Sequence, residues 1–203
     1  MKRFVISYQK VVILCIVTVF VTGSGQGLRT GIGGDANSQG DVAIAGCTCH
    51  ADQPDNSVTV VLGGIPYHYG LGQEYELRVQ LIGGPAIDTT SQTGGFSMRV
   101  SSGTLGPGTG YDGLVQNWED DLTSLTHTDS GSKTTDRTWV ISWTSPEEGS
   151  GAVTFWLAGN AVNGDLMPSE LDRWNRLTTT VDEGSDDGRT RTVFSGNGDI
   201  NPP

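Results

Sequence analysis

The feature that most constrains the fold is an alternation of apolar and polar residues within residues 138–165. Every second residue is apolar in residues 139–143 and again in residues 153–157. This period of two is typical of half-buried β-strands. The linking residues 145–151 include a proline and two glycines, which allow the chain to reverse. The pattern predicts a β-hairpin that carries three tryptophans at the centre of the hydrophobic core.

Shorter runs with the same period occur along the rest of the chain. The clearest is residues 75–81, which we expect to form part of the core wall opposite Trp139, Trp143 and Phe155. Residues 106–121 are predicted to form a long loop with one buried aromatic side chain. Seven or so short strands between glycine turns indicate an all-β, two-sheet sandwich. The remaining predicted strands are 58–62, 96–100, 122–128, 176–181 and, as an extra edge strand, 190–194.

The N-terminal residues have the pattern of a secretory signal peptide. Three basic residues precede an apolar run at residues 11–21, and small residues follow it, with a cleavage site expected before Gln26. A bilayer-spanning helix needs about 20 apolar residues, so this run is too short. We therefore expect residues 1–25 to be removed and the mature protein to be secreted or displayed on the cell surface. The mature chain is predicted to contain an extended lead-in (26–46), one sandwich domain (47–181) and a flexible acidic tail or linker (182–203).

The charge balance limits the partners of the mature chain. Removal of the signal leaves nine basic residues against 23 acidic ones, a formal charge of −14. Such a charge disfavours nucleic acid and anionic lipid. The sequence ends without an anchor helix or a sorting signal, so we expect membrane attachment only through a C-terminal anchor missing from it. The expected partner is an unknown surface or extracellular molecule.

Four short motifs occur in a fixed order and resemble a known family. They are Thr-His-Thr at residues 126–128, W-x-x-x-W-T-x-P at 139–146, G-x-G-x-V-T-F at 149–155 and G-N-x-x-N-G-D at 159–165. Over roughly residues 46–181 the chain resembles the Reeler-like domain of exported prokaryotic proteins, the choice-of-anchor V group. The resemblance implies an immunoglobulin-like sandwich on the cell surface and little about activity.

The family resemblance also draws attention to Cys47-Thr48-Cys49-His50. Members of the group frequently have Cys-x-x-Cys-His near the start of the domain, as a haem-attachment-like element, and this chain has one residue fewer between its cysteines. Haem c attached through Cys47 and Cys49 with His50 as iron ligand is one interpretation. The same residues suit a copper or zinc ion. The alternatives are a strained Cys47–Cys49 disulfide, intermolecular pairing, or two reduced thiols.

A cofactor site here needs a further donor, and the other two histidines of the chain are the candidates. His68 lies between two tyrosines and His127 ends a predicted strand, so each also fits an ordinary structural role. Met98 shares a face with Phe96 and Val100, which favours a place in the core over a ligand role.

One turn has the composition of a calcium site. Asn160, Asn163 and Asp165 place three oxygen-bearing side chains within six residues, a pattern that also fits an Asx turn without metal. No nucleophile elbow, phosphate loop or Ser/His/Asp arrangement is present, so we do not expect an enzyme. The sequence favours an exported binding or interaction module. The alternative is a haem c- or metal-binding redox protein that uses Cys47, Cys49 and His50.

Overall fold

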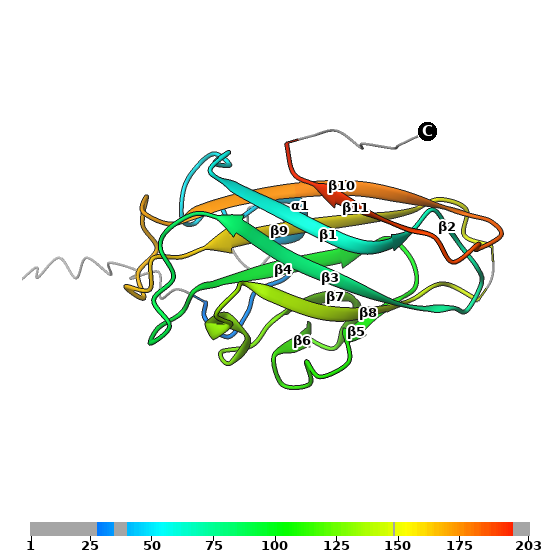
Figure 1. Ribbon diagram of the computed structural model, residues 1–203, viewed down its shortest axis with the longest axis horizontal. Helices are drawn as coiled ribbons and strands as arrows, with labels where there is room; N and C mark the ends of the chain where they lie inside the picture. The colour runs from blue at the N-terminus through cyan, green and yellow to red at the C-terminus, as the bar shows by residue number, and fades with distance from the viewer. Residues whose placement is uncertain (1–27, 35–39, 148, 197–203) are drawn as a thin grey trace, which may run out of the picture.

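The computed structural model describes residues 28–34, 40–147 and 149–196, which form a sandwich of two β-sheets (Figure 1). The predicted signal peptide lies outside these residues. The first sheet has the order β11-β1-β3-β8-β5 and contains β1 (Val58–Pro66), β3 (Glu74–Gly83), β5 (Thr104–Pro107), β8 (Thr138–Thr144) and β11 (Thr190–Phe194). The second has the order β2-β10-β9-β4-β7-β6 and contains β2 (His68–Tyr69), β4 (Gly94–Val100), β6 (Val115–Trp118), β7 (Asp121–His127), β9 (Val153–Ala161) and β10 (Arg173–Glu183).

The alternating pattern of the sequence becomes the two faces of each sheet. In β3 the apolar residues from Tyr75 to Leu81 are buried, while the residues between them face outward. Trp139, Trp143 and Phe155 are fully buried in the core between the sheets, as predicted. Their burial gives the sandwich most of its aromatic core volume, and each large ring contributes roughly 2–3 kcal/mol from apolar area.

The predicted hairpin is wrong, because β8 and β9 belong to different sheets. β8 pairs with β3 and β5, whereas β9 pairs with β4 and β10. The two strands face each other across the core, where the rings of Trp143 and Phe155 meet edge to face with centroids 4.8 Å apart. Alternation specifies which face of a strand is buried but not which strand it pairs with. A flexible link between two such strands therefore fits a hairpin within one sheet as well as a connection between two sheets.

The prediction that residues 75–81 lie in the wall opposite Trp139 and Trp143 is also wrong, because alternation does not specify which strands pair. Tyr75 pairs directly with Trp143 in the five-stranded sheet, and their rings stack with centroids 5.4 Å apart. β3 is therefore a neighbour of β8 in one wall, and the wall opposite them contains Phe155.

Two other stretches contain more structure than expected. Residues 106–121, predicted as a loop, include the end of β5 and all of β6, and the aromatic Trp118 is half-buried. After Val181, where we expected the domain to end, β10 continues to Glu183 and β11 pairs antiparallel with β1, as the predicted edge strand.

The N-terminal segment, here residues 28–34 and 40–50, lies over the outer face of the six-stranded sheet. Its short helix α1 (Val42–Ala45) lies against β4 and β9, so the expected extended lead-in contains a helical turn. The side chain of Asp41 caps this helix at the backbone N of Ala43 and binds Arg99 of β4 at 2.7 Å. Among the described residues, none belongs to a helix long and apolar enough to cross a membrane.

Candidate functional site

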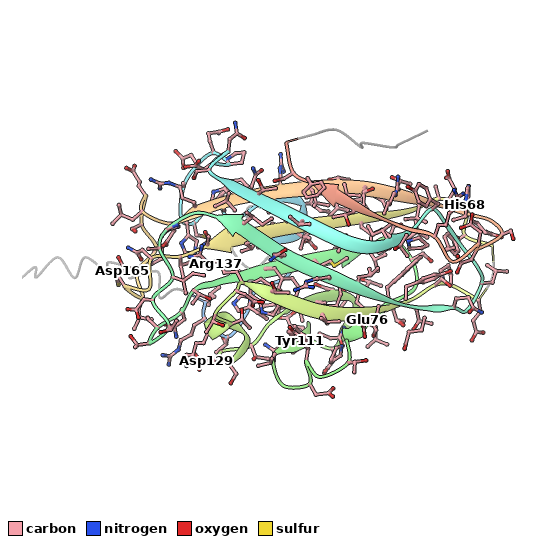
Figure 2. The ribbon with its side chains drawn as sticks, in the orientation of Figure 1. His68, Glu76, Tyr111, Asp129, Arg137 and Asp165 are labelled. Carbon is pink, nitrogen blue, oxygen red and sulfur yellow. The ribbon has the colours of Figure 1, made fainter. Side chains whose placement is uncertain are left out.

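A cavity of about 450 Å³ lies between the N-terminal segment and the outer face of the six-stranded sheet. Its walls come from three parts of the chain, namely the N-terminal segment, strands β4, β7 and β9, and the loop between β9 and β10. Figure 2 shows Asp165 of that loop at one end of the sandwich and His68 at the other. The lining residues are Leu28, Arg29, Ile32, Val42, 46–50, Gln92, 94–97, His127, Ser132, Asn160, Val162, Asn163, 165–168 and Asp172.

The predicted Cys-x-Cys-His segment forms one wall of this cavity, immediately after α1. Gly46 ends the helix with φ of 101°, a conformation that favours glycine, and its backbone N–H donates to the carbonyl of Val42. A Cβ at this position would lie 2.2 Å from the ring of Trp174, which is buried in β10. The close approach to Trp174 holds the segment against the sheet and directs Cys47, Cys49 and His50 along the cavity.

The ring of His50 is held by a buried carboxylate. Its Nδ1 lies 2.6 Å from Oδ2 of Asp172, whose side chain is 1% exposed. The other oxygen of Asp172 accepts from the backbone N of Asn163 at 3.0 Å, and Oδ2 also accepts from Ser169 at 3.4 Å. Asp172 therefore joins the loop between β9 and β10 to His50. A carboxylate on one ring nitrogen leaves the other nitrogen for a ligand, as around metal-binding histidines.

Within the described residues, Cys47 and Cys49 are not joined by a disulfide. Cys47 is half-buried, and burial, with a smaller contribution from Cys49, raises the pKa of its thiol to about 12. Cys49 is exposed. At neutral pH Cys47 is therefore protonated, a form that is a weak nucleophile and a weak metal ligand.

His127 lines the same cavity, but both sides of its ring are anchored in the protein. Nδ1 lies 3.1 Å from both the backbone N and the carbonyl O of Phe96, and the ring covers Gly95, where a Cβ would lie 2.2 Å from Cε1. Burial lowers the pKa of His127 to about 4, so the ring is neutral at pH 7. A neutral, hydrogen-bonded ring of this kind forms part of the cavity wall.

His68 lies far from the other predicted site residues. It is exposed in β2 and pairs with Asp182, whereas His50 binds Asp172 at the other end of β10. Ten extended residues separate these positions by about 30 Å. Among the described residues, no group of three or more His, Cys, Asp or Glu side chains is arranged to hold a metal ion. The predicted ligands Cys47, Cys49, His50, His68 and His127 therefore do not form one metal centre.

The remaining candidate ligands have structural roles. Met98 is fully buried in the core, as expected. Asn163 Oδ1 accepts from the backbone N of Asp165 at 3.1 Å, and Asp165 Oδ1 accepts from Met167 N at 2.8 Å. These bonds form consecutive Asx turns, one of the two interpretations of this turn. Asn160 lies apart from them, on the sheet beneath the cavity.

The sequence patterns indicate the Cys-x-Cys-His segment, His127 and the turn at residues 160–165, which all line the cavity. They give no sign of Asp172. The carboxylate is 122 residues from His50 in the sequence and stands just before β10 with no motif around it. Its role follows from burial and a long-range contact, and neither is visible in local sequence patterns.

Comparison with known proteins finds similar solved structures and no similar sequence. No family model and no curated protein matches the sequence. The structure is similar to the human F-spondin reeler domain, with 16% identity over 68% of this chain and 99% of that chain and a TM-score of 0.40. A second crystal structure of that domain gives a TM-score of 0.41 at 15% identity, covering 65% of this chain and 92% of that one.

A cohesin module from a Clostridium perfringens ATCC13124 family 33 glycoside hydrolase is similar at a comparable level. Its TM-score is 0.38 at 12% identity, covering 63% of this chain and 98% of that one. Reeler domains are among the structures that this sandwich is similar to. The choice-of-anchor group remains a prediction, and similarity at this level does not indicate what the chain binds.

Proposed function

We propose that this protein is an exported binding module that holds a small molecule or prosthetic group in the cavity beneath its N-terminal segment. One observation carries this proposal: Cys47, Cys49 and His50, which the sequence marks by their chemistry, line the same cavity as His127. Two distant parts of the chain with polar, chemically distinctive side chains therefore meet around one space. We propose binding without enzymatic activity.

The size and lining of the cavity support a small-molecule ligand. Its 450 Å³ lies within the range of about 300–1,000 Å³ that is common for ligand sites. Apolar side chains such as Ile32, Val42 and Val162 form much of the wall, and a few polar groups lie among them. Burial of an apolar ligand surface against such walls supplies affinity, and the polar groups supply orientation.

Binding of an apolar aromatic probe tests this proposal. We expect 2-methylnaphthalene to bind the full exported chain with a 1:1 stoichiometry in a calorimetric titration. Ile32→Trp places a large ring at the cavity wall and should weaken binding at least tenfold. Leu71→Trp adds the same ring at an exposed position outside the cavity and serves as the matched control. Equal affinity of the parent and Ile32→Trp, or no binding to the parent, contradicts the proposal.

Haem c is the second candidate, and the contact between His50 and Asp172 favours it. The donor set fits the group: two thiols flank one residue, and an adjacent imidazole is oriented by a buried carboxylate, within a mostly apolar cavity. Cys47 and Cys49 would hold the porphyrin through thioethers, and His50 would bind its iron. The group would supply one-electron chemistry, while Asp172 keeps His50 oriented.

Optical absorbance separates these two functions. If haem is attached, the protein purified from a host with a cytochrome c maturation system has a Soret band that survives denaturation, and its mass exceeds that of the chain by one haem. Cys49→Ser should then lose covalent attachment. A colourless protein of unmodified mass rules out haem c and leaves the first function intact.

Export and a surface or extracellular partner belong to the same proposal. The signal-like residues 1–25 and the acidic composition support them. N-terminal sequencing of protein from the culture medium should begin at Gln26. An N-terminus at Met1 in the cell fraction contradicts export.

A further inference from the structure

Two buried polar side chains in the cavity wall have unused hydrogen-bonding capacity. The side chain of Ser97 is 1% exposed and that of Asn160 is 6% exposed. Ser97 Oγ and Asn160 Oδ1 have no hydrogen-bond partner within the part of the chain that the structure describes, and both residues line the cavity. Buried polar atoms without partners are rare in folded proteins, because such an atom has lost its hydrogen bond to water.

The sheet register places these two side chains side by side on the floor of the cavity. Asn160 of β9 pairs with Gly95 of β4, and Ser97 stands two residues further along β4 on the same face. Diagonal neighbours of this kind lie roughly 7 Å apart. Gly95 between them has no side chain, and the ring of His127 lies over it. A small polar group of a ligand therefore hydrogen-bonds to one of the two side chains and does not bridge them.

The charges around the cavity disfavour an anionic ligand. Asp165 and Asp172 both line it. Among the described lining residues Arg29 is the single lysine or arginine, and its Nε already lies 3.4 Å from Asp129 Oδ1, while His50 is paired with Asp172. A carboxylate or phosphate would therefore meet two acidic side chains and no unpaired cation, so an uncharged molecule is the better match.

We propose that the cavity selects an uncharged, largely apolar molecule that carries a hydroxyl or amide group, and that Ser97 or Asn160 binds this group. The inference rests on the proposed small-molecule site and adds the class of its ligand. Ser97 donates or accepts through its hydroxyl, and Asn160 accepts through Oδ1. The apolar body of the ligand lies along Ile32, Val42 and Val162.

A matched pair of probes tests this selection, because 2-naphthol and 2-methylnaphthalene differ by a hydroxyl in place of a methyl group. We expect 2-naphthol to bind the full chain about tenfold more tightly, since one added hydrogen bond is worth about that factor. Ser97→Ala or Asn160→Leu should reduce this preference to less than about threefold, according to which side chain binds the hydroxyl. The anion of 2-naphthoic acid should bind more weakly than either probe.

Ser124→Ala is the control, because Ser124 Oγ is also buried without a partner but lies outside the cavity lining. It should keep the full preference for 2-naphthol. Equal binding of the two probes to the parent, an unchanged preference in both cavity variants, or tightest binding of the naphthoate overturns the inference and leaves the cavity as a binding site. No binding of any probe overturns the proposed site itself.

Discussion

At the scale of single residues, Asp172 connects the parts of the cavity wall. Its buried carboxylate binds His50 and also two backbone N–H groups of the loop between β9 and β10. Removal of this side chain would leave three donors without their acceptor inside the protein. Stability and the orientation of His50 therefore depend on the same residue.

Asp172→Ala should lower the free energy of unfolding by about 2–4 kcal/mol, because buried donors that lose their acceptor pay a desolvation cost. Urea denaturation measures this loss. Asp187→Ala is the matched control, since Asp187 is exposed and binds Arg189 at the surface, where an ion pair contributes about 0–1 kcal/mol. Equal losses for the two variants would contradict the role of Asp172.

His127 makes stability depend on pH. Burial lowers its pKa from 6.5 to about 4, so between these values the unfolded chain binds a proton that the folded protein does not. The stability contributed by the neutral ring is complete above pH 6.5 and is lost as the pH falls towards 4, by up to about 3 kcal/mol. His127→Gln should flatten the curve of unfolding free energy between pH 6.5 and pH 4. The exposed His68→Gln should leave its slope unchanged, and a slope retained in His127→Gln contradicts the assignment.

At the scale of elements, the N-terminal segment depends on Gly46, where it approaches Trp174. The combination of a φ of 101° and a Cβ position 2.2 Å from the indole ring excludes any side chain without movement of α1 or the sheet. Residues 28–34 and 40–46 thus form a layer over the sheet and contribute Leu28, Arg29, Ile32, Val42 and Gly46 to the cavity wall. The composition of this segment, rich in glycine and small residues, predicts an extended chain. The helical turn is not predicted because the contacts that stabilise it lie on β4, β9 and β10, which are distant in the sequence.

Gly46→Ala should shift this segment and cost about 3 kcal/mol or more, from backbone strain together with the clash. Gly110→Ala is the control, because Gly110 also has positive φ, 80°, and open space at its Cβ position. It should cost about 1–2 kcal/mol from strain alone. In Gly46→Ala, the thiol of Cys47 should also react faster with a maleimide. Similar stability and unchanged thiol reactivity in the two variants would show that the segment is not held by Trp174.

Local patterns of the sequence predict the strands well and their pairing poorly. The alternation in residues 75–81 and 139–143 is sufficient to identify β3 and β8, because burial of one face is a local property. Whether β8 pairs with β9 or faces it across the core depends on contacts between whole sheets. The site divides in the same way: the Cys-x-Cys-His segment is visible in the sequence, and its partners Asp172 and His127 are brought to it by the fold.

At the scale of the whole molecule, the aromatic cluster around Trp143 holds the two sheets together. Its ring contacts Tyr69 and Phe155 of the opposite sheet and stacks on Tyr75 of its own. Trp143→Ala should cost about 3–5 kcal/mol, because a large cavity opens between the sheets. Trp156→Ala, on the half-buried outer side of β9, should cost less than half as much. Chemical denaturation of both variants checks this, and equal losses would mean that the core is centred elsewhere.

The central claim is that the cavity beneath the N-terminal segment binds a small molecule, and the three histidines of the chain report on it directly. His50 and His127 line the cavity, while His68 lies at the far end of the sandwich (Figure 2). In an NMR titration of the full exported chain with 2-naphthol, the ring signals of His50 and His127 should shift together and saturate at a 1:1 ratio, while those of His68 stay in place. A shift of His68 alone, or no shift of any ring at saturating probe, would contradict the claim.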